Sequence, residues 1–363
     1  MALFDLVFEG GGAKGMAFAG ALNVFAQAGH THRRLIGTSA GAITATLVAA
    51  GYSADELLAA CTQVAPGTNN PVFTTFMDAP VDGDFSADQI AASETMNLLQ
   101  AAHVPQFVSK PILDELLHID LYRELFSFNE CGGFYAGDAA LIWIRRRLVD
   151  KGLAADINWA DFAAATKSDL SVVTTDVTDK QSVVLNARTA PQCPVAESVR
   201  MSMSIPFVWR EMVWQPGWGT YRGQDLSTTT HIFVDGGVLS NFALWLVDDS
   251  TPLVKAIMGD TDPNGAGTIG LYLDSNQPVP GATGPSNTPR PRLRAADRVT
   301  ALIDTMTDSR DLAVMRDNAA EICRIPVGGY GTTEFRMSAD RQQKLIQSGA
   351  TAMQAYLKTL PQS

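Results

Sequence analysis

The clearest chemical signal in the sequence is a G-x-S-x-G pattern, Gly37-Thr38-Ser39-Ala40-Gly41. It follows a short apolar run and precedes an alanine-rich stretch, which is where a strand would turn sharply into a helix. Neighbours without a Cβ let the backbone take the strained turn that exposes a serine hydroxyl. We therefore predict that Ser39 is a nucleophile at the carboxyl end of a strand. The adjacent helix N-terminus would favour developing negative charge there.

A second glycine cluster follows the first apolar run and reads Gly10-Gly11-Gly12-Ala13-Lys14-Gly15. A dinucleotide-binding turn would need an acidic residue about twenty positions further on, and none occurs between Glu9 and Asp55. A P-loop would need Ser or Thr directly after Lys14. An oxyanion hole, in which successive N–H groups converge on one point, explains best why this turn would lie beside a serine elbow. A purely structural glycine turn is the alternative.

A serine nucleophile needs a base, and two candidates occur late in the sequence. Asp235 follows an apolar run and precedes Gly236 and Gly237, so it would end a strand at the same sheet edge as the two glycine turns. His231 is the last histidine, and with Asp176 as the acid it could complete a Ser-Asp-His order. Because His231 would begin the strand that Asp235 ends, we favour Asp235. A simple Asp-Gly turn is the structural alternative for that residue.

Together these three motifs resemble the patatin-like phospholipase family. The resemblance depends on the G-G-G-x-K-G turn, the G-T-S-A-G elbow and the D-G-G motif, in the family's order and at plausible separations. Two further segments support it, because Ser202–Phe207 is similar to the family's A-S-x-A-x-P-x-x-F block and Asn241 follows the D-G-G motif. Met201, Ser204 and Ala243 depart from the family pattern, at positions that affect packing rather than chemistry.

The resemblance implies a Ser–Asp dyad without a histidine. Ser39 would attack an ester carbonyl, and Asp235 would take its proton and later activate water. The oxyanion would be held by the N–H groups of Gly11 and Gly12, together with that of Ala13 or the residue after it.

The resemblance also implies a fold and a substrate class. The fold would be a three-layer α/β/α sandwich around a mostly parallel central sheet. The substrate would be an acyl lipid, cleaved in the manner of a phospholipase A or lysophospholipase, with transient contact to a membrane or micelle surface. No metal or other cofactor would be needed. A non-catalytic lipid binder is the alternative of a different class, and the intact dyad disfavours it.

Composition argues against several classes of partner and of bound site. The chain has 363 residues and a net charge of −11, which argues against nucleic acid and against polybasic docking on anionic lipid. Its four cysteines and five histidines are scattered, so neither a zinc site nor a disulfide framework is indicated. The N-terminal apolar run has no basic leader and soon reaches Glu9, which is typical of a first strand rather than a signal peptide. A cytoplasmic location is the resulting expectation.

The elements around the motifs would bring them together. We predict strands at residues 3–8 and 35–38, followed by helices at 16–28 and 40–50. This order implies parallel strands joined by a right-handed crossover, so both glycine-rich turns would lie at one edge of the sheet.

The whole chain, residues 1–363, is predicted to form one domain, with a motif-bearing core at residues 3–245 and a helical extension at 294–360. Inserted helices predicted at 87–102 and 111–126 could form a lid or a pocket wall, although core helices are the simpler interpretation. An activating partner could bind at the Pro- and Gly-rich loops 66–86 and 276–291. The other predicted elements are a helix at 138–149, a hairpin of 170–176 with 182–185, a helix at 196–203, strands at 208–214, 232–234 and 268–273, and helices at 294–320 and 339–360.

Overall fold

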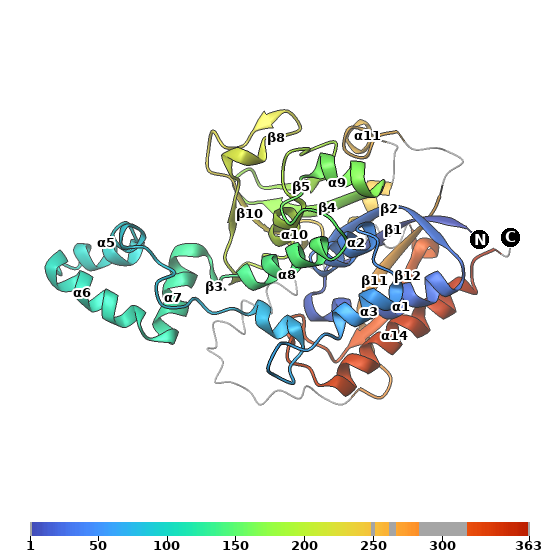
Figure 1. The fold of residues 1–363 in the computed structure, drawn as a ribbon, viewed down its shortest axis with the longest axis horizontal. Helices are drawn as coiled ribbons and strands as arrows, with labels where there is room; N and C mark the ends of the chain where they lie inside the picture. The colour runs from blue at the N-terminus through green and yellow to red at the C-terminus, as the bar shows by residue number, and fades with distance from the viewer. Residues whose placement is uncertain (1, 248–250, 261–265, 283–317, 362–363) are drawn as a thin grey trace.

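The computed structural model describes residues 2–247, 251–260, 266–282 and 318–361 (Figure 1). Within these ranges its main sheet has eight strands in the order β12-β11-β1-β2-β4-β10-β7, with β5 also paired to β4. The strands from β12 to β4 are parallel, whereas β5 and β10 run antiparallel to β4 and β7 runs antiparallel to β10. The strands are β1 (Leu3–Phe8), β2 (Thr31–Thr38), β4 (Asp169–Asp176), β5 (Gln181–Leu185), β7 (Met212–Val213), β10 (Ile232–Asp235), β11 (Gly267–Pro278) and β12 (Ile322–Gly328).

Helices and short strands surround this sheet. The α-helices are α1 (Ala17–Gln27), α2 (Ala40–Ala49), α3 (Ala54–Cys61), α4 (Ala87–Ala91), α5 (Glu94–Ala101), α6 (Gln106–Leu117), α7 (Asp120–Cys131), α8 (Asp138–Val149), α9 (Trp159–Thr166), α10 (Val195–Ser202), α11 (Pro252–Met258) and α14 (Ala339–Leu357). The 3₁₀ helices are η1 (Gly12–Met16), η2 (Val72–Phe76), η3 (Pro216–Trp218), η4 (Gly236–Val238), η5 (Leu244–Val247) and η6 (Ala319–Glu321). Two small sheets pair β3 (Gly133–Tyr135) with β6 (Phe207–Trp209), and β8 (Thr220–Tyr221) with β9 (Gln224–Asp225).

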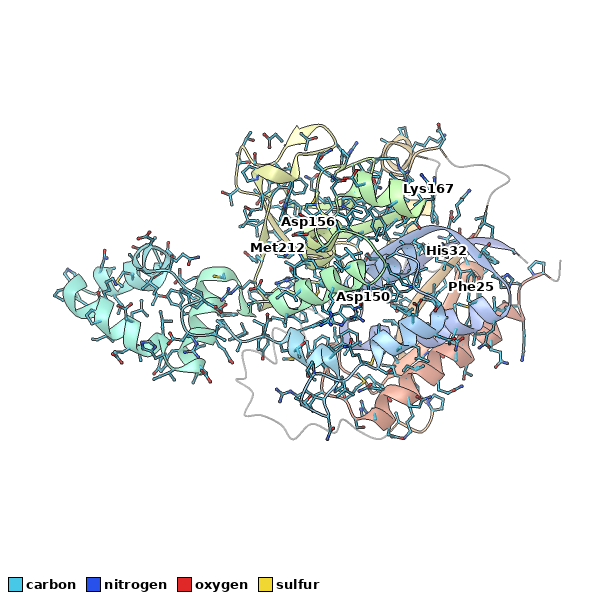
Figure 2. The ribbon with its side chains drawn as sticks, in the orientation of Figure 1. Phe25, His32, Asp150, Asp156, Lys167 and Met212 are labelled. Carbon is cyan, nitrogen blue, oxygen red and sulfur yellow. The ribbon has the colours of Figure 1, made fainter. Side chains whose placement is uncertain are left out.

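Both faces of the sheet are covered, as expected for an α/β fold. Successive strand residues point to opposite faces, so Leu6 and Phe8 join the larger core under α1, α2, α10 and α14, whereas Val7 joins a second cluster under η5 and α11. Phe25 on α1, labelled in Figure 2, is 3% exposed and packs edge-on against Phe4. The prediction of an α/β chain with a mostly parallel sheet is confirmed.

The two glycine-rich turns lie side by side, as the predicted crossover required. β1 and β2 are parallel neighbours joined through α1, so both end at the same edge of the sheet. Gly41 at the start of α2 packs so closely on the end of β1 that an added Cβ would lie 2.6 Å from the carbonyl oxygen of Glu9. A Cβ on Gly10 would lie 3.2 Å from the Cβ of Ser39.

Several predicted elements differ in detail. The helix predicted across residues 111–126 is two helices, α6 and α7, and the strand predicted at 208–214 is broken into β6 and β7. β11 continues to Pro278, and β12 beside it was not predicted. The predicted helix at 294–320 lies almost wholly outside the described residues. In the described part of the chain, no helix combines the length and the apolar character needed to cross a bilayer.

One part of the chain projects from the body. Helices α5, α6 and α7 extend away from the sheet, at the left of Figure 1. Residues Phe85–Cys131, called the helical lobe below, have their own small core, formed by Phe85, Ile90, Met96, Leu113, Leu117 and Phe126.

Candidate active site

Ser39 lies in the tight turn between β2 and α2. Its backbone has φ 53° and ψ −120°, a left-handed conformation that costs free energy for a residue with a Cβ. The Ser39 amide donates to Ser202 Oγ at 2.8 Å, and Ser202 Oγ in turn donates to the Val173 carbonyl on β4 at 2.5 Å. The Ser39 side chain caps no amide of α2. The surrounding hydrogen bonds therefore hold the strained backbone and leave the hydroxyl out of the helix cap.

Asp235 comes to this turn by a different route from the one predicted. It does end a strand, but β10 runs antiparallel to β4, so Asp235 reaches the end of β2 from the opposite direction to the one a parallel strand would take. β2 and β10 lie end to end on the same side of β4, where Thr38 pairs with Val173 and Asp235 pairs with Thr174. β5 occupies the other side of β4. The carboxyl ends of β2 and β10 therefore meet head to head.

The Asp235 carboxyl is buried, with 5% of the residue exposed. Burial raises its pKa from 3.8 to about 7, and hydrogen bonding from the Ser39 hydroxyl and the Gly237 amide opposes this rise. Oδ1 accepts from the Gly237 amide at 2.7 Å, whereas Oδ2 accepts no hydrogen bond of regular geometry from any described residue. The interaction with Ser39 is therefore a loose one. On the backbone, the Asp235 amide donates to the Ser204 carbonyl at 2.8 Å.

Asn241 fixes the glycine turn after β1. The Gly10 amide donates to the Asn241 carbonyl at 3.0 Å, and the Asn241 side-chain amide donates back to the Gly10 carbonyl at 3.3 Å. The same side chain donates to Glu9 Oε1 at 3.0 Å, while Glu9 Oε2 accepts from the Leu273 amide on β11 at 2.5 Å. These contacts join the start of the turn to the segment that follows Asp235.

The amides of the glycine turn differ in what they bind. The Gly10 amide is bonded within the protein, as described above, and so are two others. The Ala13 amide donates to the Thr332 carbonyl at 2.9 Å, and the Lys14 amide donates to the Gly11 carbonyl at 3.1 Å. The amides of Gly11 and Gly12 donate to no acceptor in the described ranges. Of the predicted donors, these two are the ones open to an anion.

The last two members of the turn have packing contacts. An added Cβ on Gly15 would lie 2.7 Å from the Cβ of Ala40, which shows how closely η1 packs on the start of α2. The Lys14 side chain donates to Ser275 Oγ at 3.1 Å at an exposed site.

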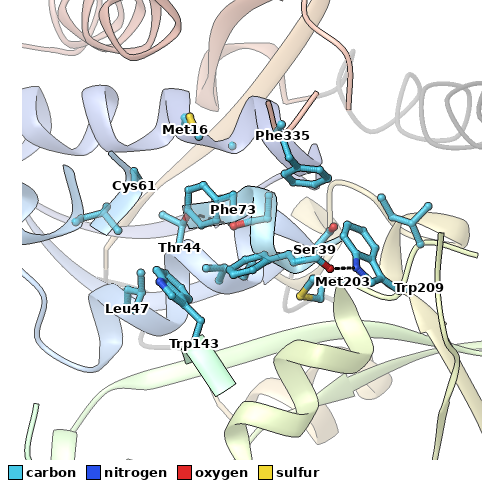
Figure 3. Close-up of a pocket in the computed structure, with 18 residues that line it drawn as sticks. Met16, Ser39, Thr44, Leu47, Cys61, Phe73, Trp143, Met203, Trp209 and Phe335 are labelled. Atoms are coloured by element: carbon cyan, nitrogen blue, oxygen red, sulfur yellow. Dashed lines mark hydrogen bonds between the residues drawn. The ribbon is translucent and has the colours of Figure 1, made fainter. Parts of the chain in front are cut away.

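An apolar pocket opens beside Ser39 (Figure 3). One face of α2 forms a wall, through residues at positions 39, 40, 43, 44 and 47. Across from it, Trp209 donates its indole N–H to the Phe76 carbonyl at 2.6 Å, the dashed line in Figure 3. The lining residues are Gly12, Ala13, Gly15, Met16, Ser39, Ala40, Ile43, Thr44, Leu47, Leu57, Cys61, Phe73, Phe76, Trp143, Met203, Ile205, Trp209 and Phe335. Such a lining suits a hydrocarbon chain.

His231 forms a pair with Asp176 away from this pocket. His231 Nδ1 lies 2.7 Å from Asp176 Oδ2, and both side chains are buried. His231 immediately precedes β10 and lies four positions before Asp235, a distance of ~13 Å along an extended strand. With Asp179 the pair brings three candidate metal-ligand atoms within 4.8 Å of one another. His231 does not line the Ser39 pocket.

Sequence reasoning missed several residues of the site. Ser202 and Ser204 were noted only as part of a family block, yet their side chain and carbonyl hold the backbones of Ser39 and Asp235. The aromatic pocket lining was missed, although the Phe-rich sequence of residues 72–76 could have indicated that this predicted loop packs inward.

Comparison with known proteins places this geometry in context. Over 365 aligned residues the chain is 28% identical to the uncharacterized protein YqhO of Bacillus subtilis, with 98% of each protein covered. Among solved structures, VipD from Legionella pneumophila has a TM-score of 0.48 and 14% identity, over 98% of this chain and 67% of that one. The type III effector ExoU has a TM-score of 0.44 and 17% identity, and the match covers 99% of this chain but about half (53%) of ExoU.

A family model gives more direct evidence of what this chain is than these individual proteins do. Residues 6–248, well over half of the chain, match the patatin-like phospholipase family. The matched region includes the glycine turn, the Ser39 elbow and Asp235. The protein belongs to the patatin-like phospholipase family.

Proposed function

We propose that the protein is a lipid acyl hydrolase that cleaves carboxylic esters, with Ser39 as the nucleophile and Asp235 as its base. The observation that carries the proposal is the meeting of a strained serine and a buried carboxyl of raised pKa beside an apolar pocket. Membership of a phospholipase family supports a lipid ester as the substrate.

Asp235 is suited to exchange a proton with Ser39. A base with a pKa near 7 is about half deprotonated at pH 7, so it is available as a base and still binds a proton well. As Ser39 Oγ bonds to the ester carbonyl carbon, its proton passes to Asp235 Oδ2, which then delivers it to the leaving alcohol oxygen as the ester C–O bond breaks. In the second half, Asp235 takes a proton from water as the water oxygen attacks the acyl-enzyme, and it returns that proton to Ser39 Oγ as the acyl C–O bond breaks and the carboxylic acid leaves. The loose contact in the free protein would tighten when substrate binds.

The developing oxyanion needs donors that are already in place. The amides of Gly11 and Gly12 are the candidates in the glycine turn, because they have no acceptor among the described residues. The first amides of α2 lie directly after Ser39, and the helix N-terminus adds a favourable partial charge.

The acyl chain would lie in the pocket along α2. From Ser39 to Leu47 the pocket wall spans eight residues of helix, ~12 Å at 1.5 Å per residue. Each methylene that moves from water into this pocket contributes about 0.8 kcal/mol. The pocket thus favours binding of an acyl chain over a polar headgroup.

Replacing Ser39 with alanine tests the proposal. Ser39→Ala should lower ester hydrolysis by several orders of magnitude without unfolding the protein, because it removes the only covalent nucleophile of the scheme. A fluorophosphonate should label the native protein at Ser39, as peptide mapping can establish. Ser227→Ala, a serine outside the pocket, is the matched control and should behave like the native protein.

Two outcomes would contradict the assignment. Substantial hydrolysis by Ser39→Ala would exclude Ser39 as the nucleophile. A native protein that binds lipid but neither hydrolyses esters nor reacts with the fluorophosphonate would be a non-catalytic lipid binder.

A further inference from the structure

The helical lobe exposes an unusual amount of apolar surface. Fifteen large hydrophobic side chains are exposed in the described ranges, and six of them lie in this lobe of 47 residues. They are Leu98, Ile112, Ile119, Leu121, Tyr122 and Leu125. Scattered apolar residues need no explanation, whereas a contiguous group indicates an interaction site.

On α7 these side chains form a continuous stripe. Leu121, Tyr122, Leu125 and Phe128, called the α7 stripe below, follow the spacing of one helix face. The opposite face of α7 carries the buried residues Arg123, Phe126 and Ser127. One face of α7 therefore packs in the core of the lobe, whereas Leu121, Tyr122 and Leu125 of the stripe are exposed and Phe128 is half-buried.

The stripe leads to the pocket beside Ser39. The Phe128 ring stacks on Phe134 at a centroid distance of 4.6 Å and lies 5.8 Å from the Phe207 ring. Phe134 and Phe207 lie on the paired strands β3 and β6, and β6 ends at Trp209, which lines the pocket. Aromatic contacts thus connect α7 to β6, the strand whose last residue lines the pocket.

Phe207 supplies an independent observation on this path. Its φ is 69°, a left-handed conformation that is strained for a bulky residue, and 39% of the residue is exposed. Strained backbone that persists in a fold tends to mark a functional position. Here the strain holds an aromatic side chain at the surface between the stripe and the pocket.

The charge of the lobe restricts what can bind the stripe. The lobe carries seven acidic and two basic residues, a net charge of −5 with its two histidines neutral. Such a surface is repelled by anionic lipid, which attracts basic segments instead. An uncharged or zwitterionic surface has no such penalty, and aromatic side chains such as Tyr122 and Phe128 are favoured at membrane interfaces.

We propose that the α7 stripe and Phe207 dock on the surface of a zwitterionic lipid assembly and pass an acyl chain from it toward the Ser39 pocket. The proposal rests on the proposed function for its reason to meet lipid, but the docking itself needs no catalysis. The stripe would enter the interface sideways, with the acidic side chains of the lobe remaining in water.

The direct test is binding of the full chain to vesicles. The Ser39→Ala protein, which should not consume the lipid, is mixed with phosphatidylcholine vesicles and separated by flotation. Leu121→Gln combined with Leu125→Gln should lower the vesicle-bound fraction at least about tenfold, because burial of two leucines contributes more than the free energy of one tenfold step. Glutamine keeps the helix propensity of α7. Ile142→Gln with Val149→Gln, exposed apolar residues on α8, is the matched control and should bind like the parent protein.

Activity gives a second readout. With Ser39 intact, the Leu121 and Leu125 substitutions should lower the ratio of vesicle hydrolysis to hydrolysis of a water-soluble short-chain ester about tenfold, and the α8 control should keep that ratio. If the native protein hydrolyses neither substrate but the stripe variant alone loses vesicle binding, the proposed function fails and the docking surface stands.

Three results would overturn the docking proposal. The first is binding to phosphatidylglycerol vesicles in preference to phosphatidylcholine. The second is equal loss of binding in the stripe variant and the α8 control. The third is a native dimer in solution that the stripe substitutions convert to a monomer, which would make the stripe an interface between two copies of this chain.

Discussion

Asp235 illustrates how burial can prepare a residue for chemistry. An aspartate in water has a pKa near 3.8 and is a weak base, whereas burial raises the pKa of Asp235 to about 7. No basic side chain contributes to its pKa. A general base works best when its pKa lies near the working pH. The buried environment of Asp235, rather than the residue type, places its pKa in this range.

The pH profile follows from this pKa. Only the deprotonated Asp235 can accept the Ser39 proton, so kcat/KM for a soluble ester should be constant above about pH 8 and fall about tenfold per pH unit below pH 7. Initial rates at substrate concentrations well below KM, between pH 5 and 9, measure this directly. A profile that stays flat down to pH 5 would mean that Asp235 is not the base or is not buried as described.

Single residues were predictable from the sequence only where a motif isolates them. Ser39 and Asp235 stand in short glycine-rich motifs that point to chemistry. Ser202 and Asn241 act through contacts with residues 163 and 231 positions away, and no local pattern encodes such contacts.

At the scale of elements, the positions of the glycine turn differ in how well they tolerate a side chain. Gly12 has φ 53°, and a Cβ there would collide with the Thr332 carbonyl. Gly11 has φ −178°, which any residue adopts, and a Cβ there would meet only the end of the Leu273 side chain. A positive φ is therefore required at Gly12 and not at Gly11.

Alanine substitutions should separate the two positions. Gly12→Ala should lower kcat by about two to three orders of magnitude, the effect of losing one oxyanion donor, because relief of the strain would turn its amide away. Gly11→Ala is the matched control and should lose much less, since its backbone can stay in place. Both variants are assayed on a soluble ester, and their melting temperatures are compared with the native value. Equal losses at the two positions would contradict this account of the turn.

The direction of β10 shows what element-level reasoning can and cannot provide. Its existence followed from the apolar run before Asp235, and its end was correctly placed at that residue. Its antiparallel direction depends on which strand it pairs with, and a run of four residues carries no information on its partner. Ser39 and Asp235 lie close together as predicted, but the prediction assumed the wrong direction for β10.

At the scale of the whole molecule, the sheet was the predictable part. Its first two strands, their crossover and their shared edge follow from hydrophobic periodicity and the handedness rule. The helical lobe was predicted as helices, but its projection from the body depends on packing that no local periodicity specifies. The pocket also depends on packing that local periodicity does not specify, because its walls come from segments distant in sequence: α2, α3, η2, α8 and β6.

The topology of the whole sheet decides which end of β10 takes part in catalysis. Asp235 meets Ser39 where β2 and β10 end, while His231 and its partner Asp176 lie at the other end of β10.

Asp235→Asn should fold well, because an amide oxygen can still accept from the Gly237 amide. Since the folded-state pKa is raised, the stability gained from protonating Asp235 is present below about pH 4 and lost as the pH rises through about 7. The Asn variant should therefore melt above the native protein at pH 8.

The measurement that tests the central claim most directly is kcat/KM for one soluble ester in Asp235→Asn and His231→Gln, assayed side by side at pH 8. Glutamine retains a donor for Asp176, so both variants replace an ionisable side chain by an amide without leaving a buried partner alone. The Ser39–Asp235 dyad predicts a loss of about two to four orders of magnitude for Asp235→Asn and nearly native activity for His231→Gln. An active Asp235→Asn with an inactive but folded His231→Gln would contradict it and assign the reaction to a Ser-His-Asp triad.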